Sequence, residues 1–166
     1  MTDTHSPATL PEMRVESLCR IDSKSRLTLP EVLHPVVKEW GNECKVAKER
    51  PGALSLWAPN SSDTAIEAAI AAALAKYEAR KNQNLLDDLM TLGRLRSTRE
   101  TTVKLDGRAR MTIPQAFREF LGVEPDGQAM VVAATVCIEI WRPEAWVEYV
   151  ESRIADYRSI TESLLG

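Results

Sequence analysis

Two short segments carry basic residues whose chemistry suits the recognition of a phosphate backbone or of base edges. Segment 22–30 and segment 106–114 each hold two of them, namely Lys24 and Arg26, and Arg108 and Arg110. An Arg side chain can bond guanine O6 and N7 together, and both residue types attract phosphates. Each Arg could instead pair with Asp22 or Asp106, four residues earlier, and only hold a turn. The two roles are compatible.

The two segments are copies of each other. Asp, Arg, Thr and Pro recur at the same internal positions, 84 residues apart, with apolar residues between them. The offset extends downstream without a gap, where Leu54, Leu56, Trp57 and Pro59 match Ile138, Ile140, Trp141 and Pro143. The repetition indicates a tandem pair of units of about 45 residues, each too small for a stable core of its own, so we expect a shared core.

Each unit is predicted to contain two hairpins separated by a helix. In both, the Asp closes the first turn, apolar and polar residues alternate in the strands, and the motif Pro starts the helix. We expect strands at 18–21, 27–29, 44–48, 53–57, 101–105, 111–113, 128–133 and 136–141. Residues 63–92 are predicted to form one bent helix or two, ending at Gly93. A long helix with one apolar stripe is expected from Pro143 onward.

The basic residues are concentrated near the motifs although the chain carries a net charge of -3. Residues 14–26 contain four bases against two acids, and residues 94–110 contain six against two. Binding follows the local field more than the total charge. Arg20 and Lys104, just before the two motifs, are therefore further candidates for contact with DNA.

Other function classes find little support. The three cysteines are odd in number and lack metal-ligand spacing, which favours a reducing, intracellular compartment and predicts no metal or other cofactor. Phosphate-binding Gly loops, nucleophile elbows and Cys/His pairs at recognisable spacing are missing, so we do not expect an enzyme. The N-terminal residues resemble no secretory signal, and no apolar run is long enough to span a membrane.

The duplicated Asp-x-x-x-Arg motif, followed by apolar-Thr-apolar-Pro, resembles the MraZ family of bacterial transcriptional regulators. Each unit resembles a SpoVT-AbrB module. The resemblance implies an α+β fold, a tandem swapped-hairpin AbrB-like β-barrel pseudo-dimer with connecting and C-terminal helices. The expected boundaries are a disordered tail at 1–14, modules at 15–62 and 99–144, a helical connector at 63–98 and a C-terminal helix at 145–166.

The resemblance also implies a function. The family binds double-stranded DNA at direct repeats in promoters upstream of division and cell-wall genes, including its own, and forms homo-oligomeric rings. We therefore expect a cytoplasmic, nucleoid-associated regulator that makes no contact with membranes. Carried over position by position, the DNA-contacting residues are Lys24, Arg26, Arg108 and Arg110.

The chain departs from the family pattern just before each motif Arg, where Ser25 and Ala109 replace the usual Gly. Gly commonly serves a backbone angle that a Cβ disfavours. The missing glycines and the acidic overall charge together support an alternative function, an AbrB-like assembly or interaction protein that has lost DNA affinity. A third is a DNA-binding protein partnered by a small toxin, which the tandem arrangement disfavours.

Overall fold

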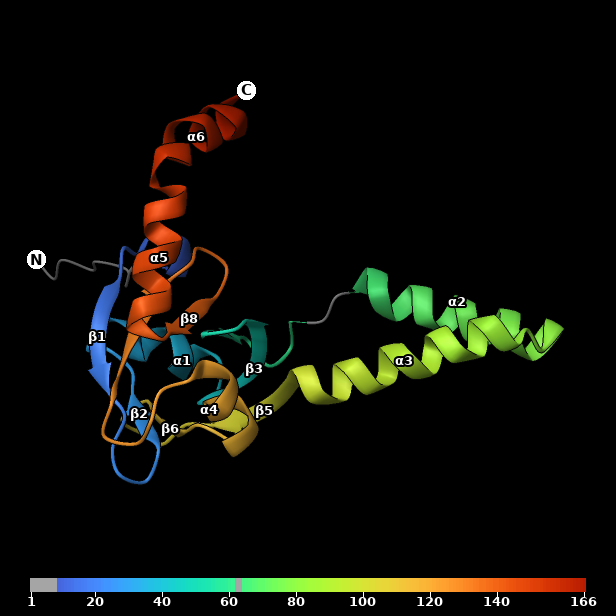
Figure 1. Ribbon diagram of the computed structural model, residues 1–166, viewed down its shortest axis with the longest axis horizontal. Helices are drawn as coiled ribbons and strands as arrows, with labels where there is room; N and C mark the ends of the chain where they lie inside the picture. Colours follow the sequence, from blue (N-terminus) through green and yellow to red (C-terminus); the bar gives the residue numbers. More distant parts are fainter. Residues whose placement is uncertain (1–8, 62–63) are drawn as a thin grey trace, which may run out of the picture.

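The computed structural model describes residues 9–61 and 64–166, which form a mixed α+β body with two helical extensions (Figure 1). In the first half of the chain the elements of the body are β1 (Glu16–Arg20), β2 (Arg26–Thr28), the 3-10 turn η2 (Glu31–Leu33), α1 (His34–Glu39), β3 (Glu43–Arg50) and β4 (Ala53–Trp57). In the second half they are β5 (Glu100–Lys104), β6 (Arg110–Thr112), α4 (Gln115–Leu121), β7 (Gln128–Ala133) and β8 (Ile138–Trp141). The predicted order of hairpin, helix and hairpin is therefore present in both halves.

The strands form two antiparallel sheets that join the halves of the chain. The larger sheet has the order β1-β7-β8-β4-β3-β5, so each edge strand pairs with a strand of the opposite half. The smaller sheet pairs β2 with β6. Within the described residues these pairings do not close into a barrel, so the α+β class is confirmed and the predicted barrel is not.

The repeat offset changes by one residue inside the second hairpin. Cys44 and Val46 face the core from β3, and their counterparts in β7 are Ala129 and Val131, 85 residues on. A β-bulge near the end of β3 restores the offset of 84 before β4. The sequence expectation of an ungapped repeat is therefore wrong across β3 and β7, because strand residues must alternate correctly to reach the core.

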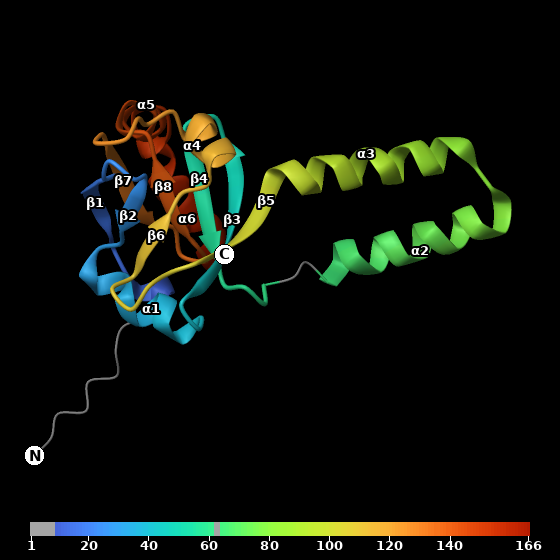
Figure 2. The same cartoon turned by 90° about the horizontal axis from the view of Figure 1, so that it is seen from below.

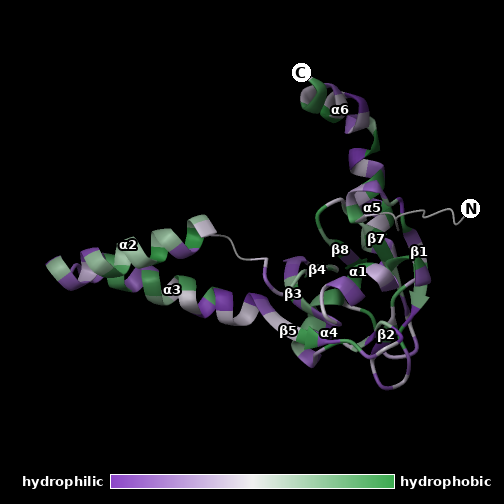
Figure 3. Ribbon diagram, turned by 180° about the vertical axis from the view of Figure 1, so that it is seen from behind, coloured by the Kyte–Doolittle hydropathy of each residue, from purple (hydrophilic) through white to green (hydrophobic). Residues whose placement is uncertain are grey.

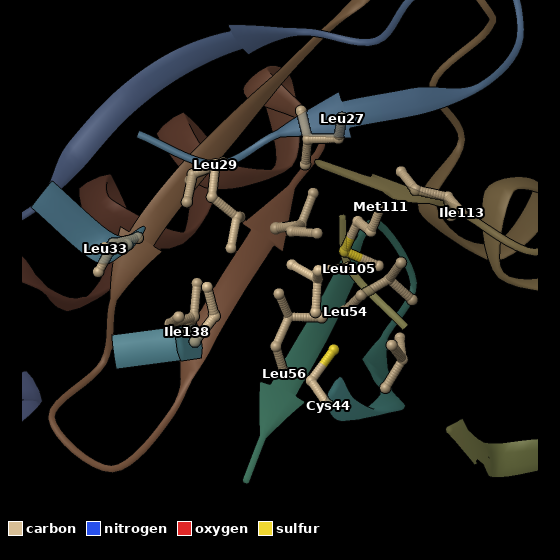
Figure 4. Close-up of a cluster of buried hydrophobic side chains, with 14 of the residues drawn as sticks. Leu27, Leu29, Leu33, Cys44, Leu54, Leu56, Leu105, Met111, Ile113 and Ile138 are labelled. Carbon is tan, nitrogen blue, oxygen red and sulfur yellow. The ribbon is translucent and has the colours of Figure 1, made fainter. Parts of the chain in front are cut away.

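The core lies between the two sheets and draws on both halves of the chain. Apolar residues of the motif strands, Leu27 and Met111, point from the small sheet towards Leu54 and Ile138 of the large one (Figure 4). All four side chains are buried. A core assembled in this way means that neither half completes it alone, as the small size of each unit predicts.

The first extension is an arm of two antiparallel helices, α2 (Thr64–Arg80) and α3 (Gln83–Arg99), which projects away from the sheets (Figures 1 and 2). Asn82 caps α3 through its side chain, which accepts from the backbone of Asn84 and Leu85. The predicted stop at Gly93 is wrong, because α3 continues to Arg99 and passes directly into β5.

The second extension is the C-terminal tail, α5 (Pro143–Arg153), the 3-10 turn η3 (Ile154–Asp156) and α6 (Tyr157–Leu165). The predicted single long helix is broken at η3. Among the described residues, the tail packs on the body through the start of α5, where Trp146 and Tyr149 lie against Trp141. No described helix combines the length and the apolar character needed to cross a membrane.

The expected disordered tail at 1–14 is contradicted over its last residues. Leu10 to Glu12 form the 3-10 turn η1, Leu10 is buried, and Met13 packs against the core. Residues 1–8 lie outside the described residues. An apolar Leu and Met within a polar stretch were the signal for this packing.

Candidate nucleic-acid interface

The β2–β6 pair is a short two-stranded ribbon with one buried and one outward face. Leu27 stands opposite Met111 and both are buried. Since side chains alternate along a strand, the residues on either side point outward. They are Arg26, Thr28, Arg110 and Thr112. Two arginines that are 84 residues apart in sequence thus share one face.

Each motif Asp closes its turn and holds its Arg. Asp22 Oδ1 accepts the backbone N–H groups of Lys24 and Arg26, both at 2.9 Å, and Asp22 Oδ2 accepts Arg26 Nε at 2.8 Å. Asp106 makes the same three bonds to Arg108 and Arg110, at 2.9, 3.0 and 2.9 Å. In both turns one Asp carboxylate thus accepts two backbone N–H groups and the side chain of the motif Arg.

These bonds lower the pKa of both carboxyl groups below the ordinary value of 3.8. The largest cause at Asp22 is the backbone N–H of Arg26, and the Arg26 side chain adds to it. The largest cause at Asp106 is the backbone N–H of Arg108. Each Arg engages its Asp through Nε, and within the described residues no hydrogen bond is found from its Nη atoms. The ion pair therefore orients the guanidinium while leaving its outer edge to a ligand.

The positions where Gly was expected adopt the conformation that Gly would have served. Ser25 has φ 61° and Ala109 has φ 57°, both left-handed. The carbonyl of Ser25 accepts the N–H of Ile113, and the carbonyl of Ala109 accepts the N–H of Leu29, both at 3.0 Å. A backbone hydrogen bond thus joins each turn to the opposite motif. Ser25 and Ala109 adopt the left-handed conformation although both carry a Cβ atom.

The remaining predicted residues surround the ribbon. Lys24 and Arg108 are exposed at the two turns. Arg26 and Arg110 together line one hollow with Arg20 and another with Lys104. All six basic residues predicted for DNA contact therefore lie on or beside the ribbon.

Two of these bases face acidic neighbours that sequence reasoning missed. Arg20 Nη2 lies 2.7 Å from Asp126 Oδ1, in an exposed ion pair. Lys104 stands across the sheet from Glu43, and in the described part of the chain it has no ion pair within 4 Å. Neither acid is near its base in sequence, so only the pairing of strands from opposite halves could reveal it. Thr28 and Thr112 were also missed, although strand alternation places them beside the arginines.

Other polar groups form no competing site. Cys44 and Cys137 are buried and Cys19 is half-buried, all as free thiols. Burial raises the pKa of Cys44 and Cys137 to about 12, which keeps them protonated and unreactive. Among the described residues no cluster of three His, Cys, Asp or Glu side chains could hold a metal ion.

The chain is similar in sequence to proteins that share one family name. A family model described as "MraZ protein, putative antitoxin-like" matches residues 98–165. A protein of Rhodococcus opacus named "Transcriptional regulator MraZ" is 28% identical over 148 residues, 89% of this chain and 92% of the relative. The second half of the chain matches the MraZ family model, and most of the chain is similar to an MraZ protein. A match of 148 residues out of 166 necessarily includes both ribbon strands. The MraZ model covers β5 to α6, and therefore only the β6 strand of the ribbon.

Shorter matches to other MraZ proteins are more similar. The "Transcriptional regulator MraZ" of Clostridium beijerinckii is 44% identical over 62 residues, and that of Symbiobacterium thermophilum is 34% identical over 64 residues. These matches span 42% and 45% of the two relatives, which is less than half of their length.

Proposed function

We propose that this chain is a DNA-binding transcriptional regulator of the MraZ type, and that the β2–β6 ribbon is its DNA-contacting element. The observation that carries the proposal is the convergence of Arg26 and Arg110 on one exposed face of a two-stranded ribbon. The major groove of B-DNA admits a two-stranded β-ribbon. Lys24, Arg108, Arg20 and Lys104 flank the ribbon, where they would contact phosphates.

The proposal also assigns a role to each segment of the chain. Residues 15–62 and 99–144 act as two SpoVT-AbrB modules that exchange hairpins, with residues 63–98 as the connector and 145–166 as the C-terminal helical segment. The exchange of edge strands between halves supports this, because β1 and β5 each pair with the other module. The small and large sheets would together act as the barrel of the pseudo-dimer.

We further propose that the protein regulates promoters that contain direct repeats. These promoters lie upstream of division and cell-wall genes, including the gene of this chain. Each ribbon offers only a short contact, so one site would bind weakly. Several copies in a homo-oligomeric ring would bind several repeated DNA elements at once, and this avidity would raise the overall affinity. The protein would work in the cytoplasm, associated with the nucleoid.

The alternative function, an assembly protein without DNA affinity, rests on the missing glycines and on the acidic overall charge. The structure removes the first of these two grounds. Ser25 and Ala109 hold the left-handed turn that Gly would hold, so the missing glycines do not distort the loop. The acidic overall charge remains, but the ribbon face keeps its basic residues. DNA binding is therefore the function that the geometry supports better.

The test measures fluorescence anisotropy of the duplex upstream of the chain's own gene, against a scrambled duplex, over a range of salt concentrations. Arg26→Ala and Arg110→Ala should each weaken binding and reduce the slope of log K against log[salt] by about 1. Lys76→Ala, an exposed base on the arm, is the matched control and should change neither. Unchanged binding of both Arg variants at every salt concentration would contradict the assignment, and no binding at low salt would favour the assembly alternative.

A further inference from the structure

A hollow of about 670 Å³ lies where three segments of the first half of the chain meet. These segments are the turn η1, the helix α1 and the residues that follow β4. They are separated in sequence, so the hollow exists only in the folded chain. Pockets that bind small molecules have volumes of about 300–1,000 Å³. The hollow therefore has room for a small organic molecule.

Most of the lining of this hollow is apolar. Its apolar members are Leu10, Pro35, Val36, Trp40 and Pro59. The helix α1, which contributes several of them, carries both hydrophobic and hydrophilic residues (Figure 3). Trp40 is half-buried, because part of its indole packs against the core while another part lines the hollow. An apolar wall with an aromatic ring and a few polar groups is typical of small-molecule sites.

The fold of the module does not require an aromatic residue at the position of Trp40. The repeat matches Trp40 to Glu124, or to Pro125 once the offset has changed to 85. Both of these residues are exposed, and the second half still forms the same order of elements. The aromatic ring is therefore a property of the first half alone, as a site specific to that half would need.

Glu39 and Asn60 bring polar side chains to the hollow, and both are exposed. Neither side chain makes a hydrogen bond or an ion pair with another described residue. Among the described residues that line the hollow none is basic, and Lys38 beside Glu39 is not one of them. Glu39 is also the last residue of α1, where the helix dipole disfavours a negative charge. The carboxylate therefore favours a cationic ligand.

We propose that this hollow binds a small organic ammonium ion, with the apolar body of the ion against Trp40 and its cationic head at the carboxylate of Glu39. The face of an indole ring also attracts a cation. The side-chain oxygen of Asn60 can accept a hydrogen bond from the ammonium group. The inference goes beyond DNA binding and does not depend on it, because the hollow shares no lining residue with the two hollows of the ribbon.

Charge favours this class of ligand over others. Glu39 would repel a phosphate or a carboxylate, and no basic group lines the hollow to bind one. A neutral apolar molecule would fill the hollow but leave the carboxylate without a partner. A small organic cation satisfies both the apolar wall and the charge. Its binding would join η1, α1 and the segment after β4, and would stabilise the folded chain by mass action.

The experiment compares three probes of similar size that differ in charge. Phenethylamine is cationic at pH 7, 2-phenylethanol is neutral and 3-phenylpropionate is anionic. The full chain is labelled with 5-fluorotryptophan, and fluorine NMR follows the signal of Trp40, which is assigned by its absence in Trp40→Phe. Phenethylamine should shift this signal saturably, with a Kd in the millimolar range. The neutral probe should bind about fivefold more weakly, and the anionic probe more weakly still.

Two substitutions at exposed positions should change the affinity in opposite directions. Glu39→Gln removes the charge but keeps the shape, so it should raise the Kd of phenethylamine about three- to fivefold. Asn60→Asp adds a second carboxylate and should lower the Kd by a similar factor. Glu31→Gln removes an exposed acid of η2 that does not line the hollow, and this control should leave the Kd unchanged. Circular dichroism shows whether each variant keeps the fold of the parent.

The proposal is overturned if phenethylamine leaves the Trp40 signal unmoved at about 20 mM. Equal affinity for the three probes also overturns it, because charge then selects nothing. An E31Q effect as large as that of E39Q would show a general attraction to acidic surface, which contradicts a site. DNA binding by E39Q and N60D should match that of the parent in the anisotropy experiment, so failure of this proposal is distinguishable from failure of the proposed function.

Discussion

Arg118 on α4 donates a hydrogen bond from Nη1 to the hydroxyl of Ser25 in the first motif turn. The Nε of Arg118 is buried and has no hydrogen-bond partner in the described part of the chain. Ala109 has no hydroxyl at the equivalent place in the second turn. The first turn therefore has a side-chain hydrogen bond to the opposite half of the chain, and the second turn has no equivalent at Ala109.

Removing that hydroxyl should destabilise the protein. Ser25→Ala leaves the Arg118 guanidinium with a lost bond in a partly buried place, which costs about 1–3 kcal/mol for a charge-assisted hydrogen bond. Equilibrium unfolding in urea, followed by circular dichroism, measures the change. The backbone angle is not at issue, since Ala109 already shows that Ala tolerates this turn.

A double-mutant cycle separates the bond from other effects of the substitution. In an Arg118→Met background the bond is already absent, so Ser25→Ala should then cost little. If Ser25→Ala lowers the free energy of unfolding equally in both backgrounds, the hydrogen bond to Arg118 is not the cause of the destabilisation.

Ala109 provides a second test of the turn conformation. With φ 57° and 3% exposure, it occupies a left-handed position inside the core. Ala109→Val should destabilise the protein by about 2 kcal/mol or more, because a β-branched residue is strained at positive φ and its two added methyl groups must fit at a buried position. The same urea experiment measures it.

Ala109→Gly is the matched comparison. Gly relieves the left-handed strain but adds flexibility to the unfolded chain, so its effect should stay within about 1 kcal/mol of the parent. If Val and Gly were equally tolerated, the positive φ at this position would be in question.

The sequence was sufficient for the body of the fold because the repeat was readable. The turn-closing Asp, the alternation around Leu27 and Met111, and the helix starts after the motif Pro residues are local, and local rules predict them. The ribbon itself joins residues 84 apart, and the equivalence of the two motifs was the only sign of it. Arg118 and Asp126 were beyond reach, because their partners belong to the other half of the chain.

The extensions were predicted less well for a different reason. Gly93 predicts a helix stop, but a single Gly in a helix costs only about 1 kcal/mol, and the apolar residues around it continue the helical pattern. The break at η3 has no sequence signal comparable to a Pro or a Gly. Both wrong predictions lie in segments that pack little against the body. Weak local conformational preferences therefore determine where these helices end or break.

Acid should destabilise the protein through the motif turns. The pKa of Asp22 is lower in the folded state than its ordinary value of 3.8, so the folded state prefers the charged carboxylate. Its contribution to stability is present above the unfolded pKa and is lost as pH falls through the folded pKa. The urea midpoint should therefore decline from about pH 4 downward.

Asp22→Asn keeps an oxygen for the backbone N–H groups but removes the charge that holds Arg26. It should lower the urea midpoint at pH 7 and make the acid decline shallower. Asp88→Asn, at an exposed position of the arm, is the control and should leave the pH profile unchanged. A parent-like profile for D22N would mean that the turn does not depend on the carboxylate charge.

Glu139 on β8 should show the opposite pH dependence. Burial raises its pKa above the ordinary value of 4.5, and the nearby charge of Glu49 adds to the rise, although Trp141 Nε1 donates to Oε1 at 3.2 Å and opposes it. The folded state thus binds this proton more tightly than the unfolded chain does. The contribution is fully present below the unfolded pKa and is lost as pH rises through the folded pKa.

Glu139→Gln should therefore raise the urea midpoint at pH 7, because the amide oxygen can still accept from Trp141 without a charge to desolvate. Near pH 4 the parent carboxyl is largely protonated, so the two midpoints should converge. Glu148→Gln, at an exposed position on α5, serves as the control for the removal of one negative charge. A gain for E139Q that is as large at pH 4 as at pH 7 would show that the improvement comes from packing and not from the relief of a buried charge.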